Sequence, residues 1–118
     1  MSSTLFRIPG QVLTASTATL MYTAPSSGTT PSSTAFQFLM LNTSGSTVNW
    51  WLWRVPNGGT VPILSSDVPQ HLIVANQPLL AGERQSLDDK TTFQGGDMLY
   101  VLANGSGVTA TGSVAGLF

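Results

Sequence analysis

The sequence predicts an all-β fold, a single antiparallel β-sandwich domain of about eight strands. Two features of the chain predict it. The first is a series of short segments rich in Val, Leu, Thr and aromatic residues, separated by stretches in which Gly, Pro, Asn and Ser are frequent. Amphipathic stretches of helical length with capping residues are missing from the pattern. The 118 residues fit one domain, 1–118, which can bury about two thirds of the surface of its unfolded chain.

Each expected strand is an apolar or alternating run between turn-forming residues. In chain order the runs are 11–15, 19–24, 35–42, 47–56, 71–75, 84–87, 98–103 and 108–114. The N-terminal segment 1–9, with Leu5 and Phe6, is either an arm that reaches a neighbouring subunit or the first edge strand. The last run alternates cleanly, so its Thr109, Thr111 and Ser113 are expected to face water or a neighbour.

Several turns carry specific expectations. The segments 42–46 and 104–107 each join two apolar runs and contain the Asn and Gly residues of tight hairpins, so both are predicted to be hairpin turns. The segments 80–84 and 93–98 each place an acidic residue, Glu83 or Asp97, beside a small-residue turn. We expect these carboxylates to hydrogen-bond backbone amides of their own turns.

The tryptophan-rich run 47–55 has large apolar side chains on both of its faces. Strand alternation puts Val48, Trp50 and Leu52 on one face and Trp51, Trp53 and Val55 on the other. The preceding run is expected to pair with it. This run places Phe36, Phe38 and Met40 on one face and Gln37, Leu39 and Leu41 on the other. A sheet with two apolar faces needs a cover on each face.

Two covers for the second face are considered. The irregular segment 56–69 could cross it within the same subunit, and an intersubunit contact, which the pattern favours, could bury it instead. The core is expected to contain Trp50, Leu52, Phe36 and Phe38. The sequence does not decide which face of these strands is core and which is interface, so the two roles can be exchanged. The predicted interface residues are Trp51, Trp53, Val55, Leu39, Leu41, Leu5 and Phe6.

Composition argues against several classes of partner. Lys and Arg number 4 against 5 Asp and Glu, and they are scattered, whereas a nucleic-acid binder gathers cations on one surface. The N-terminus lacks the pattern of a signal peptide, and no apolar run approaches a membrane span, so neither nucleic acid nor membrane is an expected partner. The polar residues are mainly Ser and Thr, and few residues are charged. Such a surface suits a chain held in an assembly, because a free monomer with so little charge is poorly protected against association.

Reactive groups are sparse. The chain has no Cys, and His71 is its single His, so a catalytic triad or a thiolate metal site is not indicated. Asp88, Asp89 and Asp97 lack the ligand spacing of a calcium loop, and an acidic turn is the preferred interpretation. The turn at 58–59 lacks the Lys of a phosphate loop.

A paired-carboxylate site is no better supported. Nothing in the spacing of Asp67, Glu83 and the other acidic residues favours glycoside hydrolysis. The sequence therefore predicts no enzyme and no catalytic, cofactor or metal site. The strongest functional rival to an interface is a carbohydrate platform, since Trp51 and Trp53 lie two apart on one strand face and could stack on sugar rings.

Three parts of the chain carry a resemblance. They are the corner Tyr22-Thr23-Ala24-Pro25, the turn Asn42-Thr43-Ser44-Gly45 followed by the alternating run 48–55, and the later corners 79–83 and 95–101. The pattern resembles small virion structural proteins of tailed bacteriophages. The tryptophan-rich strand departs from the Thr and Val pattern of that group.

The resemblance implies a β-sandwich or jelly-roll-like subunit in a phage particle. The expected function is capsid decoration, in which a cement protein bridges neighbouring shell subunits and stabilises the shell. Its partners would be the major capsid protein and itself, as a homotrimer, and no cofactor is implied. Its location would be the capsid surface of the virion after synthesis in the host cytoplasm. A tail or baseplate component, and a carbohydrate-binding module, are the alternatives.

Overall fold

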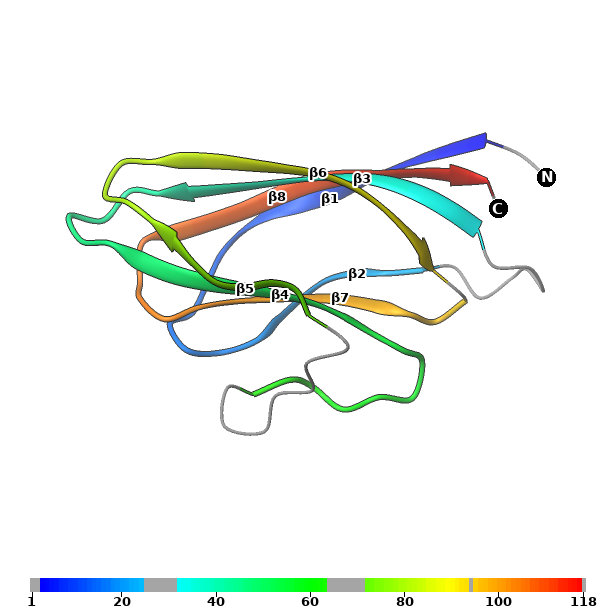
Figure 1. Ribbon diagram of the computed structural model, residues 1–118, viewed down its shortest axis with the longest axis horizontal. Helices are drawn as coiled ribbons and strands as arrows, with labels where there is room; N and C mark the ends of the chain where they lie inside the picture. The colour runs from blue at the N-terminus through cyan, green and yellow to red at the C-terminus, as the bar shows by residue number, and fades with distance from the viewer. Residues whose placement is uncertain (1–2, 25–31, 64–71, 94, 118) are drawn as a thin grey trace.

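The computed structural model describes residues 3–24, 32–63, 72–93 and 95–117. Within these residues the chain forms two antiparallel four-stranded sheets that face one another (Figure 1). In the first sheet the order is β1 (Ser3–Val12), β8 (Val108–Leu117), β3 (Ser32–Asn42) and β6 (Arg84–Phe93). In the second it is β2 (Thr19–Thr23), β7 (Met98–Ala103), β4 (Val48–Val55) and β5 (Leu72–Leu79).

The strand pairing defines a jelly roll. β1 pairs with β8, β2 with β7, β3 with β6 and β4 with β5, as in one long hairpin folded over on itself. The pairs β8–β3 and β7–β4 join these ladders into the two sheets. Eight strands in two packed sheets with this order are the jelly-roll arrangement. The predicted all-β sandwich with a jelly-roll-like fold is confirmed.

The two predicted hairpin turns are wrong. The turn after Asn42 connects β3 in the first sheet to β4 in the second, and residues 104–107 connect β7 in the second sheet to β8 in the first. Gly107 does have a left-handed φ of 82°, as expected of a tight turn. The tryptophan strand β4 therefore faces β3 across the core and pairs instead with β5 and β7. Apolar runs on both sides of a turn identify two strands but not whether they pair or face each other.

The edge strands were predicted least well. β1 begins at Ser3, so the N-terminal segment is an edge strand of the first sheet over its described residues, and 11–15 is not a strand of its own. β5 continues through Pro78, which an edge position tolerates, and Asn76 has a positive φ of 51°. β6 extends to Phe93 through a polar run that gave no strand signal. Solvent-facing edge strands need little apolar patterning.

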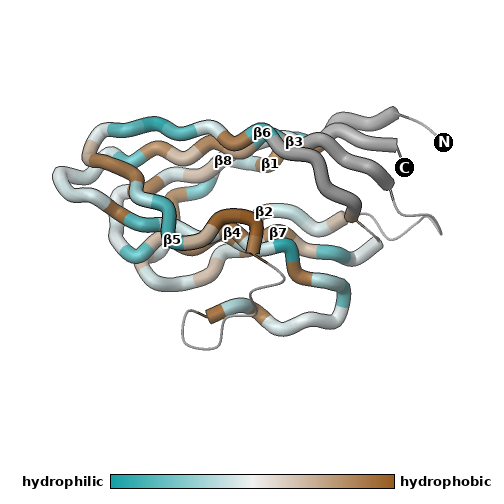
Figure 2. The backbone as a smooth tube through the Cα atoms, viewed as in Figure 1, coloured by the Kyte–Doolittle hydropathy of each residue, from teal (hydrophilic) through white to brown (hydrophobic). Residues whose placement is uncertain are grey.

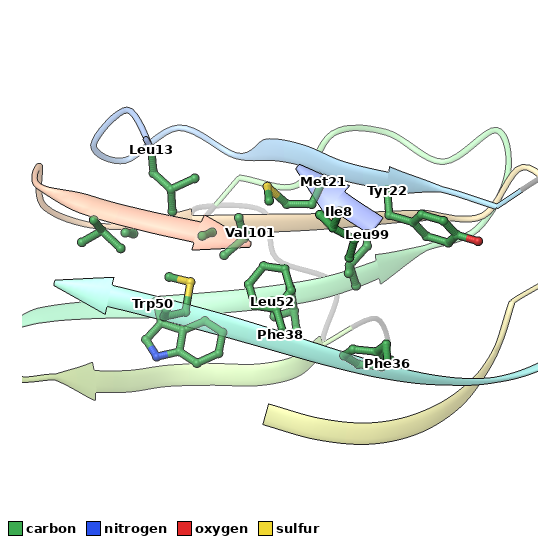
Figure 3. Packing of buried hydrophobic residues seen from close by; sticks show 14 of the residues in the cluster. Ile8, Leu13, Met21, Tyr22, Phe36, Phe38, Trp50, Leu52, Leu99 and Val101 are labelled. Atoms are coloured by element: carbon green, nitrogen blue, oxygen red, sulfur yellow. The ribbon is translucent and has the colours of Figure 1, made fainter. Parts of the chain in front are cut away.

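The main core lies between the two sheets (Figure 3). Phe36, Phe38, Trp50 and Leu52 are each at most 3% exposed, so the predicted core residues are buried as expected. Hydrophobic residues recur along the described strands of both layers (Figure 2). Two broad outer faces and two sets of loops remain as surfaces for function.

Candidate interaction surfaces

One end of the sandwich is closed by a buried amide. Asn42 is fully buried, and its Nδ2 donates to the carbonyl oxygens of Ser46 at 2.8 Å and Leu79 at 3.0 Å. Its Oδ1 accepts from the backbone N of Ser44 at 2.9 Å and from the Ser44 hydroxyl at 2.6 Å. The backbone of Asn42 also bonds to Gly82 and Glu83. This end is therefore held by satisfied polar groups, which indicates a structural role.

The outer face of the second sheet carries its own apolar cluster, separate from the main core. Trp53 and Leu102 are 0% and 1% exposed there, and Tyr100 is 8% exposed. Cross-strand pairing explains the cluster, because Trp53 lies opposite Tyr100 and Val55 opposite Met98. We call this surface, with the half-buried Trp51 and the exposed Leu20, the second-sheet face.

Residues 56–63 run beneath the second-sheet face, on its side away from the first sheet (Figure 1). A Cβ added at Gly59 would lie 2.6 Å from Cγ1 of Val55, so the backbone of this segment passes close to the Val55 side chain. The segment is fixed at Asn57, whose backbone N donates to Oδ1 of the buried Asp97 at 3.1 Å. The chain itself therefore covers part of this face.

This arrangement corrects two of the predicted interface residues. Trp53 and Val55 are 0% and 2% exposed within the single chain, so neither is available to a partner. A cover within the same subunit, which the sequence left open, reaches Val55 through Gly59, whereas Trp53 lies in the apolar cluster with Tyr100 and Leu102. Trp51 stays half-buried. Exposed large apolar residues include Leu20 at 42% on β2, and Val61 and Ile63 at 54% and 52% on the segment 56–63.

The outer face of the first sheet carries polar, charged and apolar side chains in regular rows. We call it the first-sheet face. Its three described rows run across the strands in the order β1, β8, β3 and β6. Strand register gives the rows as Arg7, Ser113, Gln37 and Asp88, then Thr111, Leu39 and Ser86 beside a bulge in β1, then Val12, Thr109, Leu41 and Arg84.

Leu39 and Leu41 are therefore on the first-sheet face, with Leu41 39% exposed and Leu39 half-buried. Leu5 and Phe6 lie in β1 at the edge of the same sheet, opposite Ala115 and Val114 of β8, and their side chains lie outside the described residues. The predicted interface is thus divided between two opposite sides of the sandwich. The cause is the assignment of β3 and β4 to different sheets.

The candidate reactive residues occupy structural positions where they are described. Glu83 Oε1 accepts from the backbone N of Leu80 at 2.8 Å, which confirms the expected turn contact, whereas the Asp97 bond described above reaches Asn57 in another loop. Asp88 is exposed on β6, and His71 and Asp67 lie outside the described residues. Among the described residues no three His, Cys, Asp or Glu side chains gather as a metal site would require, and no helix there could span a membrane.

The two-tryptophan carbohydrate platform is not present on the surface. Trp53 has no exposed area, and a sugar ring stacks only on an accessible aromatic face. Sequence reasoning also missed apolar surface residues, chiefly Val12, which is 76% exposed, and Leu20. The position of Val12 opposite Thr109 could not be read without the register of β1.

Comparison with known proteins gives a structural likeness and no sequence relative. No family model matches the chain, and no curated protein matches it in sequence. One chain of a solved structure titled "Structure of infectious bursal disease virus Gx strain" superposes on it with a TM-score of 0.57. The identity is 14%, and the match covers 98% of this chain and 32% of that chain. The chain thus spans about a third of the length of that neighbour, with which it shares a fold.

Proposed function

We propose that this chain is a structural subunit of a virus particle. The observation that carries the proposal is the jelly roll itself, similar over 98% of its length to part of a chain in a virus structure. Jelly rolls are also found in lectins and cupins, so the fold alone does not choose a function. The surfaces favour assembly, because charge is sparse and both outer faces expose apolar side chains.

The finer proposal is that the chain is a capsid decoration protein of a tailed bacteriophage. A protein that binds the assembled shell but not free subunits stabilises the shell by mass action, and many copies add their contributions. Such a role needs contact surfaces and no reaction. The resemblance of the turns and corners to those of small phage virion proteins supports this proposal, with the major capsid protein as partner and the outside of the capsid as location.

The shell contact in this proposal is the second-sheet face. Leu20, Val61 and Ile63 are exposed there, and the fixed segment 56–63 presents two of them. Exposed apolar side chains on one side of a small domain are typical of a binding surface. Trp51 is half-buried, packs against the apolar cluster of this face and is included in the proposed contact.

The copy number of the chain in purified particles tests the function. Quantitative mass spectrometry against the major shell protein is expected to give comparable numbers. A handful of copies per particle would indicate a tail or baseplate component instead. Absence of the chain from the particles would exclude a virion role, and saturable sugar binding measured by Trp fluorescence would then favour the carbohydrate-binding alternative.

Co-sedimentation with particles stripped of the chain tests the contact. The double variant Leu20→Ser with Ile63→Ser is expected to bind about tenfold or more weakly, because it removes two apolar contacts. The matched control is Leu80→Ser, since Leu80 is 56% exposed but lies in the β5–β6 turn at the end of the sandwich closed by Asn42. Equal loss in the control would contradict a contact through the second-sheet face.

A further inference from the structure

The first-sheet face has its opposite charges at opposite edges of one row. Arg7 on β1 and Asp88 on β6 are both exposed, and Ser113 and Gln37 lie between them. Three strand spacings separate the two edges by about 14 Å, so Arg7 and Asp88 cannot form an ion pair within one chain. The centre of the row is polar but uncharged.

We propose that the first-sheet face binds a second copy of this chain around a two-fold axis. The axis runs parallel to the strands, between β8 and β3. Rotation about it carries the β1 edge of one copy over the β6 edge of the other. Arg7 of each copy then faces Asp88 of its partner, and the contact occurs twice, as an isologous interface requires.

The other two rows fit the same operation. The rotation places Thr111 against Leu39 and Thr109 against Leu41, which alternates smaller and larger side chains between the faces. It also places Arg84 over Val12, the most exposed large apolar residue of those described, so that the aliphatic stem of the arginine covers it. Each described row therefore meets a chemically suitable partner row.

The dimensions of the face allow such a pairing. Packed sheets lie about 10 Å apart, a gap that an arginine and an aspartate side chain span together. Four strands of ten or eleven residues give a face of about 600 Å² per copy. The total of about 1,200 Å² is at the lower end of the range for specific stable interfaces. The small net charge of −1 opposes association little.

Sedimentation equilibrium of the purified full chain over a concentration series tests the proposal. The expected result is a reversible dimer. Arg7→Asp and Asp88→Arg each place like charges together twice in the dimer, so each is expected to raise the dissociation constant about tenfold or more. A wild-type chain that is monomeric at every concentration, or a dimer that both variants leave unchanged, would overturn it.

Mixing the two variants tests the symmetry. In a heterodimer of R7D with D88R both edge contacts again join opposite charges, so the equimolar mixture is expected to regain the wild-type dissociation constant. The matched control is Arg84→Asp, which makes the same charge change on the same face but at a position opposite Val12. Because the Arg84 stem covers Val12, R84D alone is expected to dimerise more weakly than the wild type, but it adds no like-charge contact. Its mixture with D88R keeps one like-charge edge contact and is expected to recover less. Equal recovery in both mixtures would show general charge attraction and contradict the two-fold contact.

Circular dichroism and thermal melting establish that each variant is folded. The milder pair Arg7→Gln and Asp88→Asn removes the charges without adding repulsion and is expected to weaken the dimer about threefold. If the charge-reversal variants do not fold, the milder pair tests the proposal instead, and an unchanged dissociation constant overturns it.

The inference concerns a property of the chain in solution. A dimer from a chain absent from particles would contradict the virion role alone, and an abundant virion protein that stays monomeric would contradict the inference alone.

Discussion

Phe38 and Trp50 stack across the interior of the sandwich, with ring centroids 6.2 Å apart and an interplanar angle of 18°. The two residues come from consecutive strands, β3 and β4, that lie in different sheets. The indole Nε1 of Trp50 also donates to Oε1 of Gln85 on β6 at 3.1 Å. Trp50, which is labelled in Figure 3 among the buried hydrophobic residues, therefore contacts the opposite sheet through both its ring and its polar atom.

Replacing Trp50 with Ala should destabilise the fold by about 3–5 kcal/mol, because the substitution leaves a large cavity between the sheets. Trp50→Phe should cost less, since it keeps an aromatic ring beside Phe38 but loses the bond to Gln85. Urea unfolding followed by circular dichroism measures both. The control is Trp51→Phe on the half-buried outer side, and a loss there equal to that of Trp50→Ala would contradict this view of the core.

The sequence predicted the strands with apolar runs and both faces of β4, but it could not predict the sheet to which each strand belongs. Alternation separated Trp50 and Leu52 from Trp51 and Trp53 but did not decide which pair belongs to the core. The structure buries Trp50 and Leu52 between the sheets. The turn after Asn42 looked like a hairpin because Asn and Gly suit hairpins and connections between sheets alike.

The interface prediction was limited for the same reason. Trp53 and Leu39 would share one patch if β3 and β4 were paired, but they lie on opposite sides of the sandwich because these strands belong to different sheets. The cover over Val55 depends on Gly59, four residues later, and on a bond between Asn57 and Asp97, forty residues apart in sequence. Contacts between distant segments leave no periodic signal in either segment.

Asn42→Asp should destabilise the fold by about 2 kcal/mol or more. The carboxylate would face the carbonyl oxygens of Ser46 and Leu79, which now accept bonds from Nδ2, in a fully buried site. Asn104→Asp is the matched control, because Asn104 uses Oδ1 to accept from the backbone N of Asn49, and an aspartate keeps that acceptor. Chemical unfolding should show a control effect below about 0.5 kcal/mol. Equal effects at both positions would contradict the donor role of Asn42.

Gly59→Ala should loosen the cover of the second-sheet face. The added methyl would lie 2.6 Å from Cγ1 of Val55 and 2.9 Å from the carbonyl oxygen of Pro56, so the segment would have to move away. We expect a loss of about 1–3 kcal/mol and greater access of a fluorescence quencher to tryptophan. Gly45→Ala is the control, since no atom lies within 4 Å of its added Cβ and its φ is not positive. Unchanged quenching in the Gly59 variant would contradict the proposed cover.

The stability of the fold should fall at alkaline pH through Tyr22. Burial raises the pKa of the Tyr22 phenol above its ordinary value of 10.0. Between the unfolded and the raised folded pKa the unfolded chain releases this proton while the folded chain retains it, so the free energy of unfolding decreases as pH rises above 10.0. Tyr22→Phe should flatten this decrease. The control is Tyr100→Phe, which removes a hydroxyl that donates to Sδ of Met98 at 3.8 Å. Thermal midpoints measured from pH 8 to 11 would contradict the assignment to Tyr22 if Tyr22→Phe followed the wild-type curve.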